Sequence, residues 1–295
     1  MKHQKSITIL TICVAVLAIA AASSGIFSAG GPGQHAFTTV HGERVMLYGK
    51  GLYRFDSVSM AAQAIAQDVV TLCLGIPLLL VSIVWARRDS LKGRLLLVGT
   101  LAYFLYTYTS YAFTSMYNRL FLADVALMSM SFFAFVLTMM SFDIRALAQN
   151  TGNRFPAKPI AIFLMFLGTA IGLMWLGKIV PSLFGSAVPV GLEQYTTLVI
   201  QAMDLGFIVP IAWLTAILLL QKNPFGLLLG AVVCVKAATM LTALTAMIIA
   251  QVLAGVAVPA AVCVLFPAAN AVAFVFLFVL LRTIQEPVKK GGKIA

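Results

Sequence analysis

The chain has 295 residues, of which 61% are hydrophobic and only 10% are charged. A soluble domain usually has about 25% charged residues, so this composition excludes an ordinary soluble protein and indicates a membrane protein. The net charge of +11 comes mainly from basic residues at the ends of apolar segments. That distribution is typical of membrane topology and argues against nucleic-acid binding.

The apolar segments predict an all-α polytopic integral membrane protein, with residues 1–295 forming a single transmembrane domain. We expect eight membrane-spanning helices, at residues 7–27, 63–86, 94–114, 120–142, 160–176, 197–220, 226–250 and 258–281. Seven would remain if the first were a cleaved signal peptide, with Lys2 and Lys5 as its basic start and small residues at 20–24. A retained span is favoured because the apolar character continues through Ile26 and Phe27.

Residues 30–59 form the longest polar segment, which we expect to be an extracytoplasmic loop between the first two spans. Glycine and proline at its start are typical of a loop. Either Asp56 or Ser57 is expected to cap the helix that follows. The segment is interpreted as a solvated loop, with a lid over the outer end of the bundle as the alternative.

Basic residues are distributed unequally between the two sides of the membrane. Of the 20 Lys and Arg residues, 14 fall on one side, 5 on the other, and Lys236 lies inside a span. The positive-inside rule places the richer side in the cytoplasm of a protein of the cell membrane. Both termini are then cytoplasmic if the first span is retained.

A weak internal repeat relates the second and third spans to the sixth and seventh. Pro77 and Gly93 have the same separation as Pro210 and Gly226, and each glycine precedes a run of leucines. In this register Tyr103 corresponds to Lys236. The pattern indicates a parallel 4+4 pseudo-repeat of the kind that some transporters use.

Two opposite charges lie inside adjacent apolar spans. Asp204 and Lys236 each cost about 2.5–3.5 kcal/mol on insertion scales, so each needs a partner, a cavity or a functional role. Counting residues places them at similar depths, which predicts a buried ion pair that fixes the helix register. The alternative is that Lys236 binds a substrate anion or relays a proton.

Hydroxyl groups follow one face of the third span. Tyr103, Tyr106, Thr107 and Ser110 have helical spacing and are expected to face the interior of the bundle. Three further tyrosines near the outer interface, Tyr108, Tyr111 and Tyr117, are assigned to an aromatic belt.

Polar residues gather in the outer halves of the spans, whereas the inner halves are almost purely apolar. This asymmetry predicts a polar pocket that opens to the outside. The candidate ligand-binding residues are Asp204, Lys236, Tyr103, Asp124, Tyr106, Gln201, Asp68 and Asn270.

Several chemistries are excluded by residue placement. His3, His35 and His41 lie outside the predicted spans, which excludes a haem held by histidines within the membrane. The four cysteines lie in apolar runs without a close pair, so neither a zinc site nor a disulfide framework is expected. We therefore expect no metal and no cofactor.

Three functions remain open. The first is a transporter or sensor that binds a small or lipid-like ligand in the outward-facing pocket. The second is a membrane-embedded enzyme that acts on a lipid or isoprenoid carrier at the outer leaflet, with Asp68, Asp124 or Asp204 as acid or base. The third is a non-catalytic scaffold or assembly factor. The expected partners are the lipid bilayer and a small-molecule or lipid ligand, with the oligomeric state left open.

Overall fold

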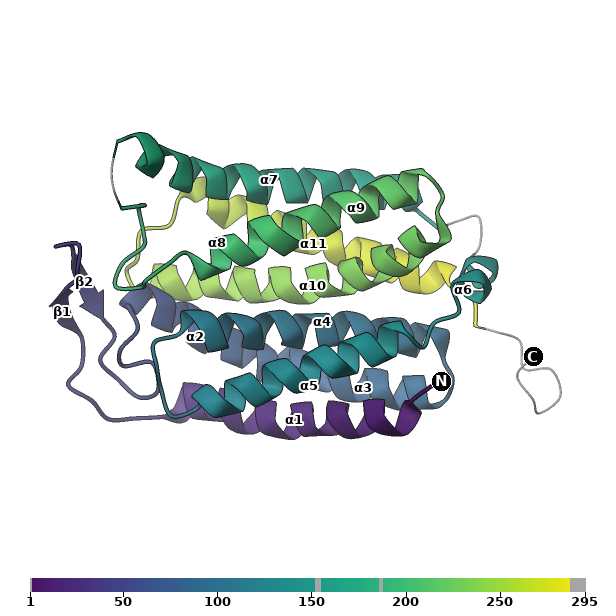
Figure 1. Ribbon diagram of the computed structural model, residues 1–295, viewed down its shortest axis with the longest axis horizontal. Coiled ribbons are helices and arrows are strands. Elements are labelled where there is room, and N and C mark those ends of the chain that lie inside the picture. Colours follow the sequence, from purple (N-terminus) through teal and green to yellow (C-terminus); the bar gives the residue numbers. More distant parts are fainter. Residues whose placement is uncertain (1, 152–154, 186–187, 287–295) are drawn as a thin grey trace.

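The computed structural model describes residues 2–151, 155–185 and 188–286 (Figure 1). Its helices are α1 (Gln4–Phe27), α2 (Val58–Val70), α3 (Ile76–Arg87), α4 (Leu91–Thr114), α5 (Phe121–Met139), α6 (Ile144–Asn150), α7 (Ala157–Phe184), α8 (Val199–Met203), α9 (Val209–Leu220), α10 (Pro224–Leu253) and α11 (Ala260–Thr283). Two π-helical segments, η1 (Thr71–Gly75) and η2 (Asp204–Ile208), join α2 to α3 and α8 to α9. Strands β1 (His35–Thr38) and β2 (Arg44–Leu47) form an antiparallel hairpin.

The predicted all-α polytopic membrane fold is confirmed. Seven helical stretches of the described chain are long and apolar enough to cross a membrane: α1, α2–α3, α5, α7, α8–α9, α10 and α11. The α4 helix is not among them, although its 24 residues would span about 36 Å. Threonine and tyrosine side chains lower its hydropathy, and it is largely buried between other helices. The eighth crossing therefore stays a prediction.

The polar segment of residues 30–59 is more ordered than expected. It holds the β1–β2 hairpin, and its end caps α2, because Ser57 accepts a hydrogen bond from the Met60 amide at 3.1 Å. Ser57, and not Asp56, is therefore the cap. The sequence also missed α6 and ended the fifth span at Leu176, whereas α7 continues to Phe184.

Successive long helices run in opposite directions, which gives the bundle two distinct ends (Figure 1). We call one the hairpin end, because it carries β1 and β2. The other is the basic end, which carries Arg87, Lys92, Arg145, Lys158, Lys222 and Arg282. Gln4 and Glu286 both lie there, since Gln4 Nε2 donates to the Arg87 carbonyl at 3.3 Å and Ser90 Oγ donates to Glu286 at 2.6 Å. The count of basic residues on the cytoplasmic side also included four that lie outside the described residues: Arg154, Lys289, Lys290 and Lys293.

The two halves of the chain, α1–α5 and α7–α11, are stacked on each other and repeat the same local structure (Figure 1). Each residue from α2 to α4 corresponds to the residue 133 positions later, as Pro77 does to Pro210. In this register η1 matches η2, and the caps of α4 and α10, Ser90 and Asn223, coincide. The preceding residues, Asp89 and Lys222, both have positive φ, at 60° and 55°. These matches agree with the predicted parallel repeat.

The π-helical segments sit at the same place in both halves, directly before a proline in the second position of the next helix. The Ile76 amide donates to the Thr71 carbonyl, and the equivalent Val209 amide donates to the Asp204 carbonyl. Such segments are rare and often mark functional sites. They draw attention to Thr71 and Asp204.

The central helices α4 and α10 cross closely. A side chain at Gly99 would overlap Val235 and lie 3.1 Å from the Val232 carbonyl, so glycine allows the two backbones to approach. Around this crossing the two halves differ. The helix α2 of the first half packs along α10, whereas its equivalent in the second half, α8, makes only light contact with α4. Likewise α1 packs along α5, whereas α7 and α11 have almost no close backbone contact. The second half is therefore the more open one.

Candidate functional site

The predicted site residues separate into two clusters, one within the first half of the bundle and one between the two halves. The first cluster is a neutral, buried network between α2, η1 and α4. Gln67 Nε2 donates to the Tyr103 hydroxyl at 2.6 Å and to Thr107 Oγ1 at 3.1 Å, and the Thr71 hydroxyl lies 2.9 Å from that of Tyr103. All four side chains are at most 1% exposed. This network holds helices together and leaves no room for a ligand.

Asp68 lies beside this network and is occupied by two tyrosines. Tyr53 donates to Oδ2 at 2.6 Å, and Tyr111 donates to Oδ1 at 3.1 Å and to the Ala64 carbonyl at 2.9 Å. Asp124 is 5% exposed and lines a cavity of about 10 Å³ together with Tyr53 and Tyr111. That volume suits about one water molecule, so this cluster has no space for a larger substrate.

The second cluster lies between the halves and is charged. Asp204, the first residue of η2, accepts a hydrogen bond from the Tyr106 hydroxyl at 2.7 Å and from the Trp175 indole at 2.8 Å. Its carboxylate therefore ties α4 and α7 to η2. Asp204, Tyr106, Trp175 and Lys236 are all partly exposed, in contrast to the first network.

Lys236 joins this cluster through an aromatic ring. Its ammonium nitrogen lies 4.3 Å from the centre of the Tyr106 ring, the geometry of a cation–π contact. The predicted direct ion pair is wrong, because no salt bridge or hydrogen bond joins Lys236 to Asp204 among the described residues. Tyr106 stands between them, with its face on the ammonium and its hydroxyl on the carboxylate.

The repeat provides an internal comparison for the charged cluster. Thr71 and Tyr103, which touch in the first half, correspond to Asp204 and Lys236 in the second. The two equivalent positions thus hold a neutral pair in the first half and two charges in the second half.

The remaining candidates lie apart from this centre. Asn270 of α11 accepts a hydrogen bond from Thr242 of α10 at 3.2 Å. Gln201 of α8 is partly buried three residues before Asp204. Neither the small cavity beside Asp124 nor the groove between α7 and α11 is lined by Asp204 or Lys236.

Two sequence-based assignments of tyrosines need correction. Tyr108 is 1% exposed and Tyr111 binds Asp68, so neither belongs to an interfacial belt, whereas Tyr117 is 78% exposed. The hydroxyl groups of α4 also do not share one environment. Tyr103 contacts Gln67 of the first half, whereas Tyr106 contacts Asp204 of the second half. A central helix packs on both sides, so one stripe contacts two environments.

Sequence reasoning missed Trp175, Tyr53 and Gln67 as partners of the charged and polar groups. The predicted fifth span ended one residue after Trp175, and no role was assigned to that indole. The available signal was that a buried indole or amide needs a hydrogen-bond partner.

Asp56 connects the loops at the hairpin end. Its Oδ1 accepts from the Met116 amide at 3.0 Å and from the Tyr195 hydroxyl at 2.9 Å, and the residue is 3% exposed. Burial raises the pKa of Asp56 to about 6, and burial together with Asp56 raises the pKa of Tyr195. This side chain links the segment of residues 30–59 to those before α5 and α8.

The raised pKa of Asp56 makes stability depend on pH. The folded state binds this proton more tightly than the unfolded state does, so the contribution is complete below about pH 4 and is lost as pH rises through 6. The loss is on the order of 2–3 kcal/mol. Melting curves should show the wild type losing stability between about pH 4 and 6 relative to Asp56→Asn, with little further change above pH 7. The exposed Glu43→Gln variant should follow the wild type, and parallel profiles for Asp56→Asn and wild type would contradict the prediction.

Within the described residues, no group of His, Cys, Asp and Glu side chains could hold a metal ion. The site that remains is the partly exposed cluster of Asp204, Tyr106, Trp175 and Lys236. Comparison with protein-family models, curated proteins and solved structures found no match for the chain.

Proposed function

We propose that the protein is a membrane transporter or sensor that binds a small or lipid-like ligand with an anionic group at Lys236. The supporting observation is that the Lys236 ammonium makes no hydrogen bond to any described residue, although it can donate three. A charge at membrane depth without an acceptor is costly. A carboxylate or phosphate of a ligand would supply the missing acceptor.

The surroundings of Lys236 support a site that can open. Asp204, Tyr106 and Trp175 come from three different helical stretches, and α8 packs only lightly against α4. Asp204 would balance the lysine charge before the ligand arrives. Movement of the α8–α9 stretch at η2 would then expose or enclose the ligand.

The enzyme alternative has weaker support. Asp68 already accepts from two tyrosines, and the adjoining cavity holds about one water, so neither Asp68 nor Asp124 has space for a lipid substrate. A scaffold would need the charged cluster only for packing. It predicts that replacing both charges by apolar residues leaves function intact.

Anion binding can be tested with hexyl phosphate as the probe and hexanol as its neutral counterpart. In a neutral detergent, saturating hexyl phosphate should raise the melting temperature of the full-length protein by roughly 5 °C, from linkage of binding to stability. Hexanol should have little effect. The Lys236→Met variant keeps the length of the side chain and should lose the response.

Lys92→Gln serves as a matched control, because it also removes one positive charge from a helix but lies at the basic end, in the first turn of α4. It should respond to hexyl phosphate as the wild type does. Equal responses of Lys236→Met and wild type, or no response in either, would reject the proposed site.

We further propose that the basic end faces the cytoplasm, as the positive-inside rule expects. Val40, at the hairpin end, is 95% exposed. In a background without the native cysteines, Val40→Cys should therefore react with an impermeant maleimide in intact cells. Arg145→Cys should react only after permeabilisation. The opposite labelling pattern would invert the topology.

A further inference from the structure

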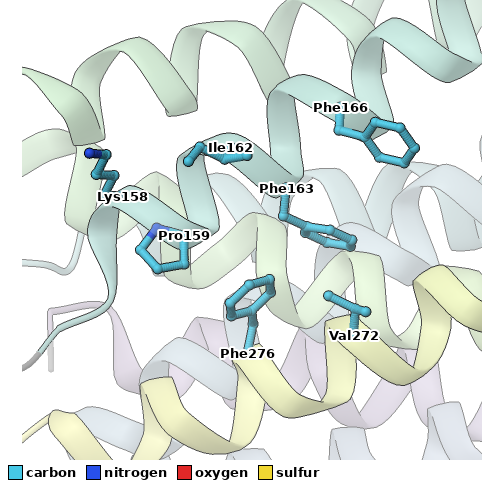
Figure 2. Close-up of a pocket in the computed structure, with 7 residues that line it drawn as sticks. All are labelled: Lys158, Pro159, Ile162, Phe163, Phe166, Val272 and Phe276. Atoms are coloured by element: carbon cyan, nitrogen blue, oxygen red, sulfur yellow. The ribbon is translucent and has the colours of Figure 1, made fainter.

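A groove runs between α7 and α11, where the second half of the bundle is open. It has a volume of about 480 Å³ and its walls are almost entirely apolar. The lining residues include Lys158, Ile162, Phe163 and Phe166 of α7 and Val272 and Phe276 of α11. Figure 2 shows Lys158 at one end of this row and Phe166 at the other.

The groove is a product of the broken repeat. In the first half α1 packs along α5, but the corresponding helices α7 and α11 have almost no close backbone contact. The rings of Phe163 and Phe276 meet across the gap, with centroids 5.3 Å apart. Phe163 is 9% exposed, while Ile162 and Phe166 are more than half exposed, so the groove has a closed floor and an open side.

The shape and charge of the groove match one kind of occupant. From Lys158 to Phe166 the helix rises about 12 Å, close to the thickness of one leaflet, which is half of a hydrocarbon core of about 30 Å. Lys158 is the second residue of α7, so its ammonium lies at the basic end, where the chain enters the membrane. A lipid with its acyl chain along the phenylalanines would place its headgroup at this lysine.

We propose that the α7–α11 groove is a binding site for an anionic phospholipid of the leaflet at the basic end. The acyl chain packs on Phe163, Phe166 and Phe276, and the phosphate contacts Lys158. This site is separate from the Lys236 cluster and does not depend on the function proposed for it.

Native mass spectrometry of the full-length protein tests the assignment with phosphatidylglycerol and phosphatidylcholine that carry identical acyl chains. The wild type should retain one phosphatidylglycerol in preference to phosphatidylcholine. Because one basic residue near a membrane surface contributes about 1 kcal/mol, Lys158→Gln should lower that preference about fivefold. Lys178→Gln, at the other end of α7, should leave it unchanged.

A variant that fills the groove with a larger side chain provides a second test of the proposed lipid site. Val272 is 40% exposed, so Val272→Trp should fold and should reduce the retention of both lipids. Lys236→Met should keep the lipid preference, which separates this site from the proposed ligand site. Equal retention of the two lipids by the wild type, or an unchanged preference in Lys158→Gln, would overturn the proposal. So would a change of oligomeric state in Val272→Trp, because it would show that a second copy of the chain occupies the groove.

Discussion

Replacing Gly25 by alanine should destabilise the protein by about 3 kcal/mol, which corresponds to roughly 5–10 °C in melting temperature. A Cβ at Gly25 would overlap the Asp68 carboxylate and lie 2.8 Å from the Tyr53 hydroxyl. Asp68 has little freedom to move away, because Tyr53 and Tyr111 both donate to it. Displacing the carboxylate would leave the buried Tyr53 hydroxyl without its acceptor, which adds to the steric cost.

Gly177→Ala is the matched control, because it makes the same change in a long helix where nothing lies within 4 Å of the new methyl group. It should stabilise α7 slightly, by about 0.5–1 kcal/mol, since alanine has the better helix propensity. Thermal unfolding of the purified variants in detergent measures both effects. A Gly25→Ala protein as stable as Gly177→Ala would show that α1 does not pack against Asp68 as described.

Replacing Asp204 by leucine should cost about 3 kcal/mol, because two hydrogen-bond donors lose their acceptor at about 1–3 kcal/mol each. The change takes the acceptor away from Tyr106 and Trp175 and removes the opposite charge that interacts with Lys236. Both hydrogen-bond donors and the ammonium would remain in place without compensation. The melting temperature should fall accordingly.

The double variant Asp204→Leu/Lys236→Met tests whether the two charges are coupled. Because the second change removes the uncompensated ammonium, the double variant should recover about 2 kcal/mol relative to the sum of the single effects. Additive losses would mean that Tyr106 isolates the two charges from each other. The same double variant should not respond to hexyl phosphate, whereas a scaffold role would leave its function intact.

The sequence predicted the broad architecture because hydropathy and helix signals act locally. Apolar length identified seven of the eight predicted spans, and the spacing of Pro77 and Gly93 relative to Pro210 and Gly226 predicted the repeat. The polar pair Asp56 and Ser57 predicted the start of α2, and Ser57 is the residue that caps it. The hairpin within residues 30–59 was missed because its strands have only four residues each, too few to show an alternating pattern.

The contacts of the site could not be read from the sequence for geometric reasons. A π-helical turn inserts one residue, which rotates the preceding residues by about 100° relative to a straight α-helix. Depth counting therefore placed Asp204 near Lys236 but could not give its direction. In addition, α4 lies between the two halves, so periodicity alone could not assign Tyr103 to one cluster and Tyr106 to the other.

The central claim is that Lys236 receives the anionic group of a ligand, and a structure of the protein with saturating hexyl phosphate tests it most directly. The claim predicts phosphate density within hydrogen-bond distance of Lys236 Nζ, about 3 Å, beside Tyr106 and Trp175. Phosphate bound elsewhere, with Lys236 still resting on the Tyr106 ring, would contradict it.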